Sequence, residues 1–430
     1  MGGMLETIRN AWKIPDLRKK ILFTVAMLLI YRIGSHIPVP GLDPNEFRKL
    51  VESGGSLFGF LDIITGGAFK LATIFAMSIT PYINSSIIMQ LLTVAIPKLE
   101  QLAKEGEEGR KIIAQYTRYG TVILGFLQAV GLYFGLRSSI IGGSNVLNFI
   151  TITFTFTAGT AFLMWLGEQI TEYGIGNGIS LIIFAGIVSR GPAGAQTLLN
   201  YYNAGTLGSG AFGILTIILI LALFVAVIAA VVWVQQAERR IPVQYAKRVV
   251  GRKMYGGQST HLPIKVNLAG VIPIIFAMSI MAFPSTIIAF VAPNSTNGIV
   301  MFFKNLNQSI WYSIINGLLI IFFTFFYSVI QFNPIEIANN MKKNGGFIPG
   351  IRPGKPTSDY IAKVLNRITW FGGLFLALIT IFPNIFYFIF HISNLWFGGT
   401  AVLILVGVAL ETIKQIESQM LMRHYKGFLE

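Results

Sequence analysis

The sequence predicts an all-α, polytopic membrane protein in which ten transmembrane helices form two inverted halves of five helices each. Three observations lead to this prediction. The 430 residues are 53% hydrophobic and only 12% charged, whereas a soluble domain carries about 25% charged residues. Ten apolar segments follow one another along the chain, and Lys and Arg are concentrated in alternate connections between them. Both patterns are typical of a chain that crosses a membrane many times.

The ten apolar segments have about the length that a membrane helix needs, because ~20 helical residues cross the hydrocarbon layer. Gly, Pro and charged residues mark their ends. The segments cover residues 20–37, 71–96, 117–136, 149–167, 178–197, 212–235, 268–290, 310–332, 368–389 and 396–413.

The first segment has the composition of a signal peptide, since Arg18, Lys19 and Lys20 precede an apolar run. Residues 33–38 offer no pattern of small residues for cleavage, however, and further segments follow. We therefore expect this segment to be retained as the first transmembrane helix.

The region 57–92 is apolar but too long for one membrane helix. The pair Gly66-Gly67 divides it into a short piece, which contains Asp62, and a longer one, which we expect to be helical over 71–96. The longer piece carries Pro81 and the polar residues Thr80, Asn84, Ser85, Ser86 and Gln90. Two interpretations stay open: a re-entrant element beside a path through the membrane, or a hairpin packed inside a helix bundle.

The positive charges predict the orientation of the chain. Of the 33 Lys and Arg residues, 26 belong to the N-terminus, to the four loops 97–116, 168–177, 236–267 and 333–367 and their borders, and to the tail 414–430. Because Lys and Arg are enriched in cytoplasmic loops, we expect both termini to be cytoplasmic. Part of the net charge of +15 is explained instead by non-specific attraction of the basic residues to anionic lipid.

The count of segments predicts two halves. Five segments precede the Gly-rich stretch 191–211 and five follow it. With an odd number of spans in each half, the halves enter the membrane from opposite sides, which is typical of an inverted repeat around a central path. We expect an N-terminal half at 11–200 and a C-terminal half at 201–430.

The cores of the segments contain no Asp, Glu, Lys or Arg, and Arg32 and Arg190 lie towards outer ends. Ion-coupled pumps generally need such groups inside the membrane, so a passive conduit is favoured, and a secondary solute transporter is the alternative. The chain has no Cys, and its four His residues are scattered. We therefore expect neither an enzyme nor a cofactor or metal.

The loops 236–267 and 333–367 are long and basic, with Gly and Pro near their tips. Loops of this length are usually functional or disordered. Arg and aromatic residues among turn-forming residues favour a docking surface for an acidic or RNA-bearing partner.

Seven motifs follow one another along the chain: TPYINSSIIMQLL, EGEEGRKIIAQYTRYG, AFLMWLGEQITEYGIGNGISLIIFAGI, QYAKR, GGQSTHLPIKVNLAGVIPIIFA, GGFIPGIRPGKP and FGGTAVLILVGVALE. In sequence, order and spacing they resemble the SecY family, the channel subunits of the bacterial Sec protein-translocation complex. The resemblance covers about residues 11–428. It implies a clamshell of two halves in the bacterial cytoplasmic membrane, through which unfolded secretory polypeptides pass and from which hydrophobic segments are released into lipid.

The resemblance also implies a constriction made of six aliphatic side chains. Position by position, these are Ile79, Ile83, Ile183, Ile187, Ile275 and Ile404. A ring of methyl groups has nothing with which to solvate an ion, so it would exclude water and ions by dewetting.

Two movable parts follow from the resemblance as well. The plug would occupy 57–70, with Leu57, Phe58, Phe60, Leu61, Ile63 and Ile64 as its body and Gly66 and Gly67 as its hinge. The lateral gate would lie between the second and third spans and the seventh and eighth, at Asn84, Ile87, Gln90 and Phe283. Asp62 receives no role, since an exposed plug face would leave it solvated.

The partners that the resemblance implies are the subunits SecE and SecG, the SecA motor, the ribosome, and the signal sequences of the translocated precursors. The docking residues would be Arg239, Arg240, Lys247, Arg248 and Arg352. No ATP-binding motif is present, so the partner would supply the work.

Overall fold

The computed structural model describes residues 4–53, 62, 65–136, 139–143, 145–205, 210–245, 248–250, 253–255, 259–291, 310–390 and 399–426. Within these ranges, only the backbone is described at 4–8, 49–53, 211, 248–250, 253–255, 259, 282–291, 310, 384–390 and 422–426.

Each of the ten predicted segments contains a helix. In chain order these are α2 (Pro15–Gly34), α5 (Thr80–Ala95), α7 (Glu107–Gly135), α8 (Val146–Tyr173), α9 (Gly178–Ser189) with α10 (Gly191–Asn203), α11 (Ala211–Gln236), α12 (Ile272–Val291), α14 (Ile310–Gln331), α16 (Lys355–Phe390) and α17 (Gly399–Lys426). Six stretches of the described chain are long and apolar enough to cross a membrane by length and composition. The predicted class, a helical polytopic membrane protein, is confirmed.

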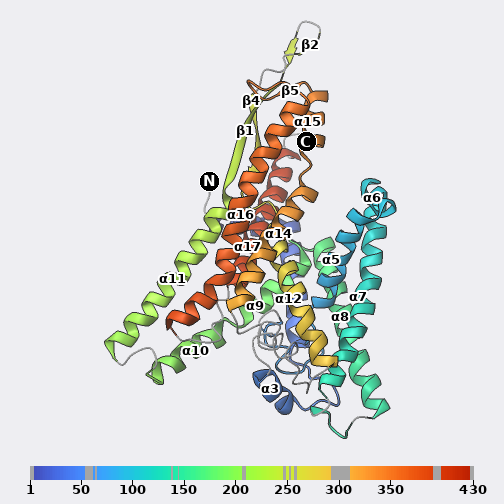
Figure 1. The fold of residues 1–430 in the computed structure, drawn as a ribbon, viewed down its shortest axis with the longest axis vertical. Coiled ribbons are helices and arrows are strands. Elements are labelled where there is room, and N and C mark those ends of the chain that lie inside the picture. The colour runs from blue at the N-terminus through green and yellow to red at the C-terminus, as the bar shows by residue number, and fades with distance from the viewer. Residues whose placement is uncertain are drawn as a thin grey trace.

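Shorter helices flank these elements: α1 (Met4–Lys13), α3 (Pro44–Ser53), α6 (Pro97–Lys104) and α15 (Pro334–Lys343). In Figure 1, α6 and the strands lie towards one end of the molecule and α3 lies at the other.

The helix predicted over 71–96 begins only at Thr80. Pro81 occupies the first turn of α5, where its missing N–H and fixed φ favour helix initiation. Residues 65–79 form successive turns instead, with positive φ at Ala72 and Ser78. Thus Pro81 starts the helix, and the predicted N-terminal boundary was wrong.

The turns of 65–79 are tied to the loop after α2. The backbone N–H of Val39 donates to Ala72 O at 2.9 Å, and that of Ile74 donates to Ile37 O at 3.0 Å. Helix α8 passes close by at Gly159, where an added Cβ would lie 2.0 Å from Ile74 O. A glycine is therefore required for this approach of backbone to backbone.

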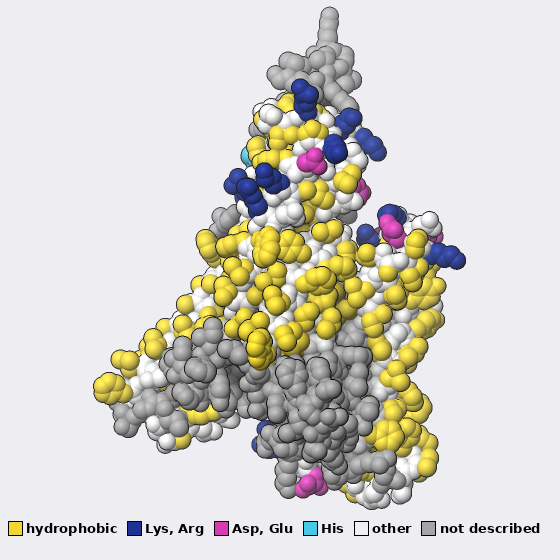
Figure 2. Space-filling view, in the orientation of Figure 1, with side chains coloured by type: hydrophobic (Ala, Val, Ile, Leu, Met, Phe, Trp, Pro, Cys, Tyr) yellow, Lys and Arg dark blue, Asp and Glu magenta, His cyan; other side chains and the backbone are white. Residues whose placement is uncertain are grey.

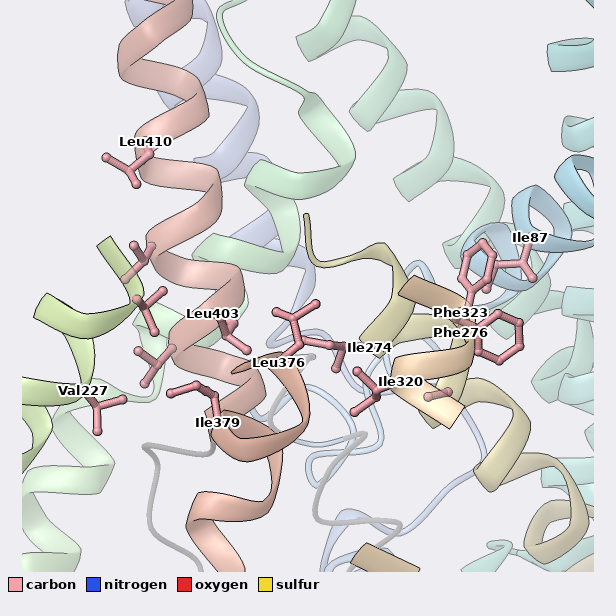
Figure 3. Close-up of a cluster of buried hydrophobic side chains, with 14 residues drawn as sticks. Ile87, Val227, Ile274, Phe276, Ile320, Phe323, Leu376, Ile379, Leu403 and Leu410 are labelled. Atoms are coloured by element: carbon pink, nitrogen blue, oxygen red, sulfur yellow. The ribbon is translucent and has the colours of Figure 1, made fainter. Parts of the chain in front are cut away.

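The C-terminal helices share a hydrophobic core, which we call the second core to distinguish it from the buried side chains of 65–79. Figure 3 shows it extending from Val227 of α11 through Leu403 of α17 and Leu376 of α16 to α12 and α14. It ends at Ile87 of α5, a helix of the N-terminal half. The two predicted halves therefore meet through apolar side chains.

The two basic loops fold together into a small sheet that the sequence analysis did not predict. Strand β1 (Glu238–Tyr245) pairs antiparallel with β4 (Ser259–Lys265) on one side and with β5 (Gly346–Phe347) on the other. Strands β2 (Arg248–Val250) and β3 (Lys253–Tyr255) form a separate ribbon. We call β1 to β5 with α15 the β module.

The β module has a core of its own. Ile241 and Val243 alternate with exposed residues along β1 and pack with Ile264, Met341 and Ile361. Figure 2 shows described Lys and Arg side chains gathered around this module and at the tip of α6, with a hydrophobic surface below them.

Candidate functional site

The predicted constriction residues lie at the junction of α5, α9 and α17. Ile79, Ile183, Ile187 and Ile404 are buried in one hydrophobic cluster, and Ile83 packs against it. We call these five residues the isoleucine cluster. Its members come from both predicted halves of the chain.

Local structure explains the alignment of the cluster. Ile183 and Ile187 are four residues apart in α9, so they lie on the same face of the helix. Asn177 caps this helix, because its Oδ1 accepts a hydrogen bond from the backbone N–H of Ser180 at 3.2 Å. Ile79 and Ile83 have the same spacing at the start of α5.

The sixth predicted residue, Ile275 of α12, packs against the second core rather than against the isoleucine cluster. Ile83 contacts both. The structure thus brings five of the six residues together in one cluster, and it packs Ile275 against a neighbouring cluster that Ile83 also contacts.

The predicted gate lies at a seam between α5 and the pair α12 and α14. Ile87 is buried beside the rings of Phe276 and Phe323 (Figure 3), which are in edge-to-face contact with centroids 5.5 Å apart. We call these three residues the gate seam. Helix α7 also contacts α12, so the second and third spans adjoin the seventh.

The other predicted gate residues are less closely packed. Asn84 and Gln90 are half-buried, and Asn84 Oδ1 has no hydrogen-bond partner among the described residues. The side chain of Phe283 lies outside the described part of the structure. The sequence analysis did not assign a role to Phe276 or Phe323, although Phe276 belongs to a quoted motif.

Of the predicted plug, residues Leu57, Phe58, Phe60, Leu61, Ile63 and Ile64 lie outside the described residues. Gly66 and Gly67 are described, both with positive φ. Gly66 rests against α9, where an added Cβ would lie 2.8 Å from Gly186 O.

Asp62 does not have the solvated position that we expected. Its side chain is 4% exposed, and its Oδ2 accepts from Arg190 Nη1 at 2.9 Å. Arg190 lies between α9 and α10, and from this position its side chain contacts Asp62. The expectation was wrong because this contact joins residues far apart in the sequence.

The predicted docking residues whose side chains are described lie on β1 of the β module or in the loop after β5. Arg239 and Arg240 are exposed on β1, and Arg240 also pairs with Glu238 at 2.6 Å. Arg352 is exposed in the loop after β5, where its carbonyl accepts from Thr357 Oγ1 at 2.9 Å. Only the backbone of Arg248 is described, and Lys247 lies outside the described residues.

Within the described residues, no group of three or more His, Cys, Asp and Glu side chains is placed to hold a metal ion. The site consists instead of an apolar junction, an aromatic seam and a separate cationic surface. These features, together with the apolar helices, define a multi-pass helical membrane protein with a cluster of buried aliphatic side chains where α5, α9 and α17 meet.

Comparisons with known proteins identify the family. A family model described as SecY matches residues 73–413. The protein translocase subunit SecY of Halalkalibacterium halodurans is 49% identical, over 99% of this chain and 100% of its own length. That of Thermotoga maritima is 47% identical, over 99% and 98%. The chain belongs to the SecY family.

The fold agrees with this assignment. A solved structure described as a protein conducting channel superposes with a TM-score of 0.68 at 21% identity, covering 94% of this chain and 93% of its own. Canine Sec61 in a ribosome-channel complex gives 0.64 at 20%, covering 94% and 93%.

Family membership fixes the general activity. The chain is a protein translocase subunit and multi-pass protein of the cell membrane, and it is not an enzyme. The solute-transporter alternative finds no support among these relatives.

Proposed function

We propose that this chain forms a conduit between an N-terminal half, 11–200, and a C-terminal half, 201–430, through which an unfolded polypeptide crosses the membrane. The observation that supports this proposal most strongly is the isoleucine cluster. Its residues come from α5 and α9 of one half and α17 of the other. A parting of the halves would open a passage at this junction.

The chemistry of the cluster suits such a passage. Aliphatic side chains cannot replace the hydration shell of an ion, so a narrow junction of isoleucines excludes ions while it is closed. They also make no directional contacts, and chains of any sequence can therefore slide past. Ile275 of α12, which packs against the second core together with Ile83, would join the constriction from this helix.

The gate seam would release hydrophobic segments into lipid. Ile87, Phe276 and Phe323 close it by apolar contact, while Asn84 and Gln90 keep it partly polar. A segment that leaves water for lipid gains ~25 cal/mol per Å² of apolar area that it buries. A seam that is partly polar and partly apolar can be exposed to water or to lipid without a large free-energy cost.

The β module would receive the partner that drives transport. Arg239, Arg240 and Arg352 form a surface suited to the carboxylates of SecA or the RNA phosphates of a ribosome. Solved relatives include a Sec61 structure in a ribosome-channel complex. Because SecA and the ribosome act from the cytoplasm, the β module and both termini would lie on the cytoplasmic side of the membrane. There the module would also approach anionic lipid. SecE and SecG would brace the outside of the helices.

A cross-link across the gate seam tests the proposal. Because the chain has no Cys, the double variant Ile87→Cys/Phe276→Cys introduces a single pair. Oxidation or a short bifunctional reagent should then block insertion of a membrane-protein precursor into reconstituted vesicles, and reduction should restore it. The single-cysteine variants are the controls. Normal insertion through cross-linked channels would contradict the gate.

A further inference from the structure

A buried carboxylate outside the conduit requires an explanation. Both oxygens of Asp62 are engaged: Oδ2 with Arg190 Nη1 at 2.9 Å, and Oδ1 with the backbone N–H of Lys70 at 2.9 Å. Burying a charge is costly unless it is paired and hydrogen-bonded. The position therefore serves to attach the segment that contains Asp62 to the end of α9.

A second cation attaches the same segment to α2. Arg32 Nη1 donates to Gly66 O at 3.2 Å and to Ser189 Oγ at 3.2 Å. Nearby, the hydroxyl of Tyr31 donates to Thr65 O at 3.3 Å. Two arginines from two helices thus hold one short stretch of chain.

That stretch is braced internally. The backbone N–H of Gly67 donates to Asp62 O at 2.9 Å, and the hydroxyl of Thr65 donates to the same carbonyl at 3.2 Å. The backbone N–H of Phe69 in turn donates to Thr65 Oγ1 at 3.1 Å. With the bond from Lys70, these contacts join Asp62 to the turns of 65–70, so these described residues can be released together.

We propose that Asp62, Arg190 and Arg32 form a polar latch that holds the 62–70 segment against α2 and α9 while the channel is closed. This inference rests on the proposed function and on the prediction, from the family resemblance, that 57–70 is the plug. Release of the segment separates the carboxylate from Arg190 and the Gly66 carbonyl from Arg32.

The latch and the exclusion of water reinforce each other. An ion pair is strong where water is excluded and weak in bulk water, because its energy scales inversely with the dielectric constant. While the segment is seated, only 28% of the Arg190 side chain and 4% of the Asp62 side chain are exposed. Once water enters, both charges are solvated and the attraction falls, so the latch favours either fully closed or fully open states.

Resting ion conductance of reconstituted vesicles tests the latch. Asp62→Asn and Arg190→Gln should each raise the resting conductance several-fold and permit transport of a precursor with a defective signal sequence. The double variant should leak no more than the leakier single variant, because the two side chains act as one pair. Arg190→Lys keeps the charge and should restore most of the closure.

A matched control is the Arg118–Glu168 pair, with Nε and Oε1 2.7 Å apart between α7 and α8. Glu168→Gln removes the same kind of contact away from the plug and should leave the resting conductance unchanged. Leak of the Asp62 and Arg190 variants equal to that of the unmodified chain, or fully additive leak in the double variant, would overturn the latch. Failure of the unmodified chain to transport any precursor would instead overturn the proposed function.

Discussion

At the scale of single residues, Ile404 shows how the side-chain chemistry of the isoleucine cluster sets the seal. It is 6% exposed and packs with Ile79, Ile183 and Ile187. A polar group placed there would lack a partner in the closed state but would be solvated in an open one. The closed state would therefore lose stability relative to the open state.

Ile404→Asn should accordingly raise the resting ion conductance. An unpaired amide costs ~1–3 kcal/mol in a protein interior, which corresponds to roughly 5- to 150-fold in the ratio of open to closed channels. Conductance across planar bilayers measures this ratio, and Ile404→Val, which keeps the aliphatic character, is the control. Equal conductance of Ile404→Asn and the unmodified chain would remove Ile404 from the seal.

The predictability of single residues differed with the kind of contact. The positions of the isoleucine cluster could be assigned from motifs, because each motif carries its residue at a fixed place. The partner of Asp62 could not, since Arg190 reaches it through space between elements remote in sequence. The sequence did not indicate Phe323 of the gate seam either. Aromatic residues are frequent throughout the apolar segments, and their spacing alone does not single one out.

At the scale of elements, each segment predicted by hydropathy contains a helix in the described part of the chain, but not every boundary was predicted. Pro81 was expected to lie inside a helix, whereas it begins α5. Most apolar residues of 65–79 are buried in turns, among them Phe69, Ala72 and Phe75, and hydropathy cannot distinguish a buried turn from a helix. The strands of the β module escaped prediction because β5 is only two residues long and pairs with a strand from another loop.

The β module also carries a prediction at this scale. Pairing of Gln244 with Phe347 and of Tyr245 with Gly346 joins the two basic loops, so we expect Arg352 and Arg239 to act on the same partner. Arg352→Glu should reduce SecA-driven transport at least tenfold, because a charge-assisted contact becomes repulsive.

Arg110→Glu, an equal charge reversal in the first turn of α7, is the control for Arg352→Glu and should leave transport near normal. Both variants should insert and fold, since both arginines are exposed. Equal loss of transport in the two variants would show an effect of net charge, and unimpaired transport by Arg352→Glu would remove the docking role.

At the scale of the whole molecule, the account depends on where the two halves meet. Counting apolar segments predicted ten helices, and each predicted segment contains a helix; the alternation predicted from the positive charges stays a prediction. Which helices adjoin across the midline could not be predicted from composition or hydropathy. The structure places α5 and α9 against α17 at the isoleucine cluster, and α5 against α12 and α14 at the gate seam.

The most direct test follows a polypeptide through that junction. Single cysteines replace Ile79, Ile187 or Ile404 in the cluster, or Leu318 and Leu374, which are 63% and 52% exposed on α14 and α16. A secretory precursor stalled during transport carries one cysteine of its own. The account predicts disulfide cross-links to the three cluster positions and none to the two exposed ones. Cross-links to Leu318→Cys or Leu374→Cys, with none to the cluster, would contradict a conduit between the halves.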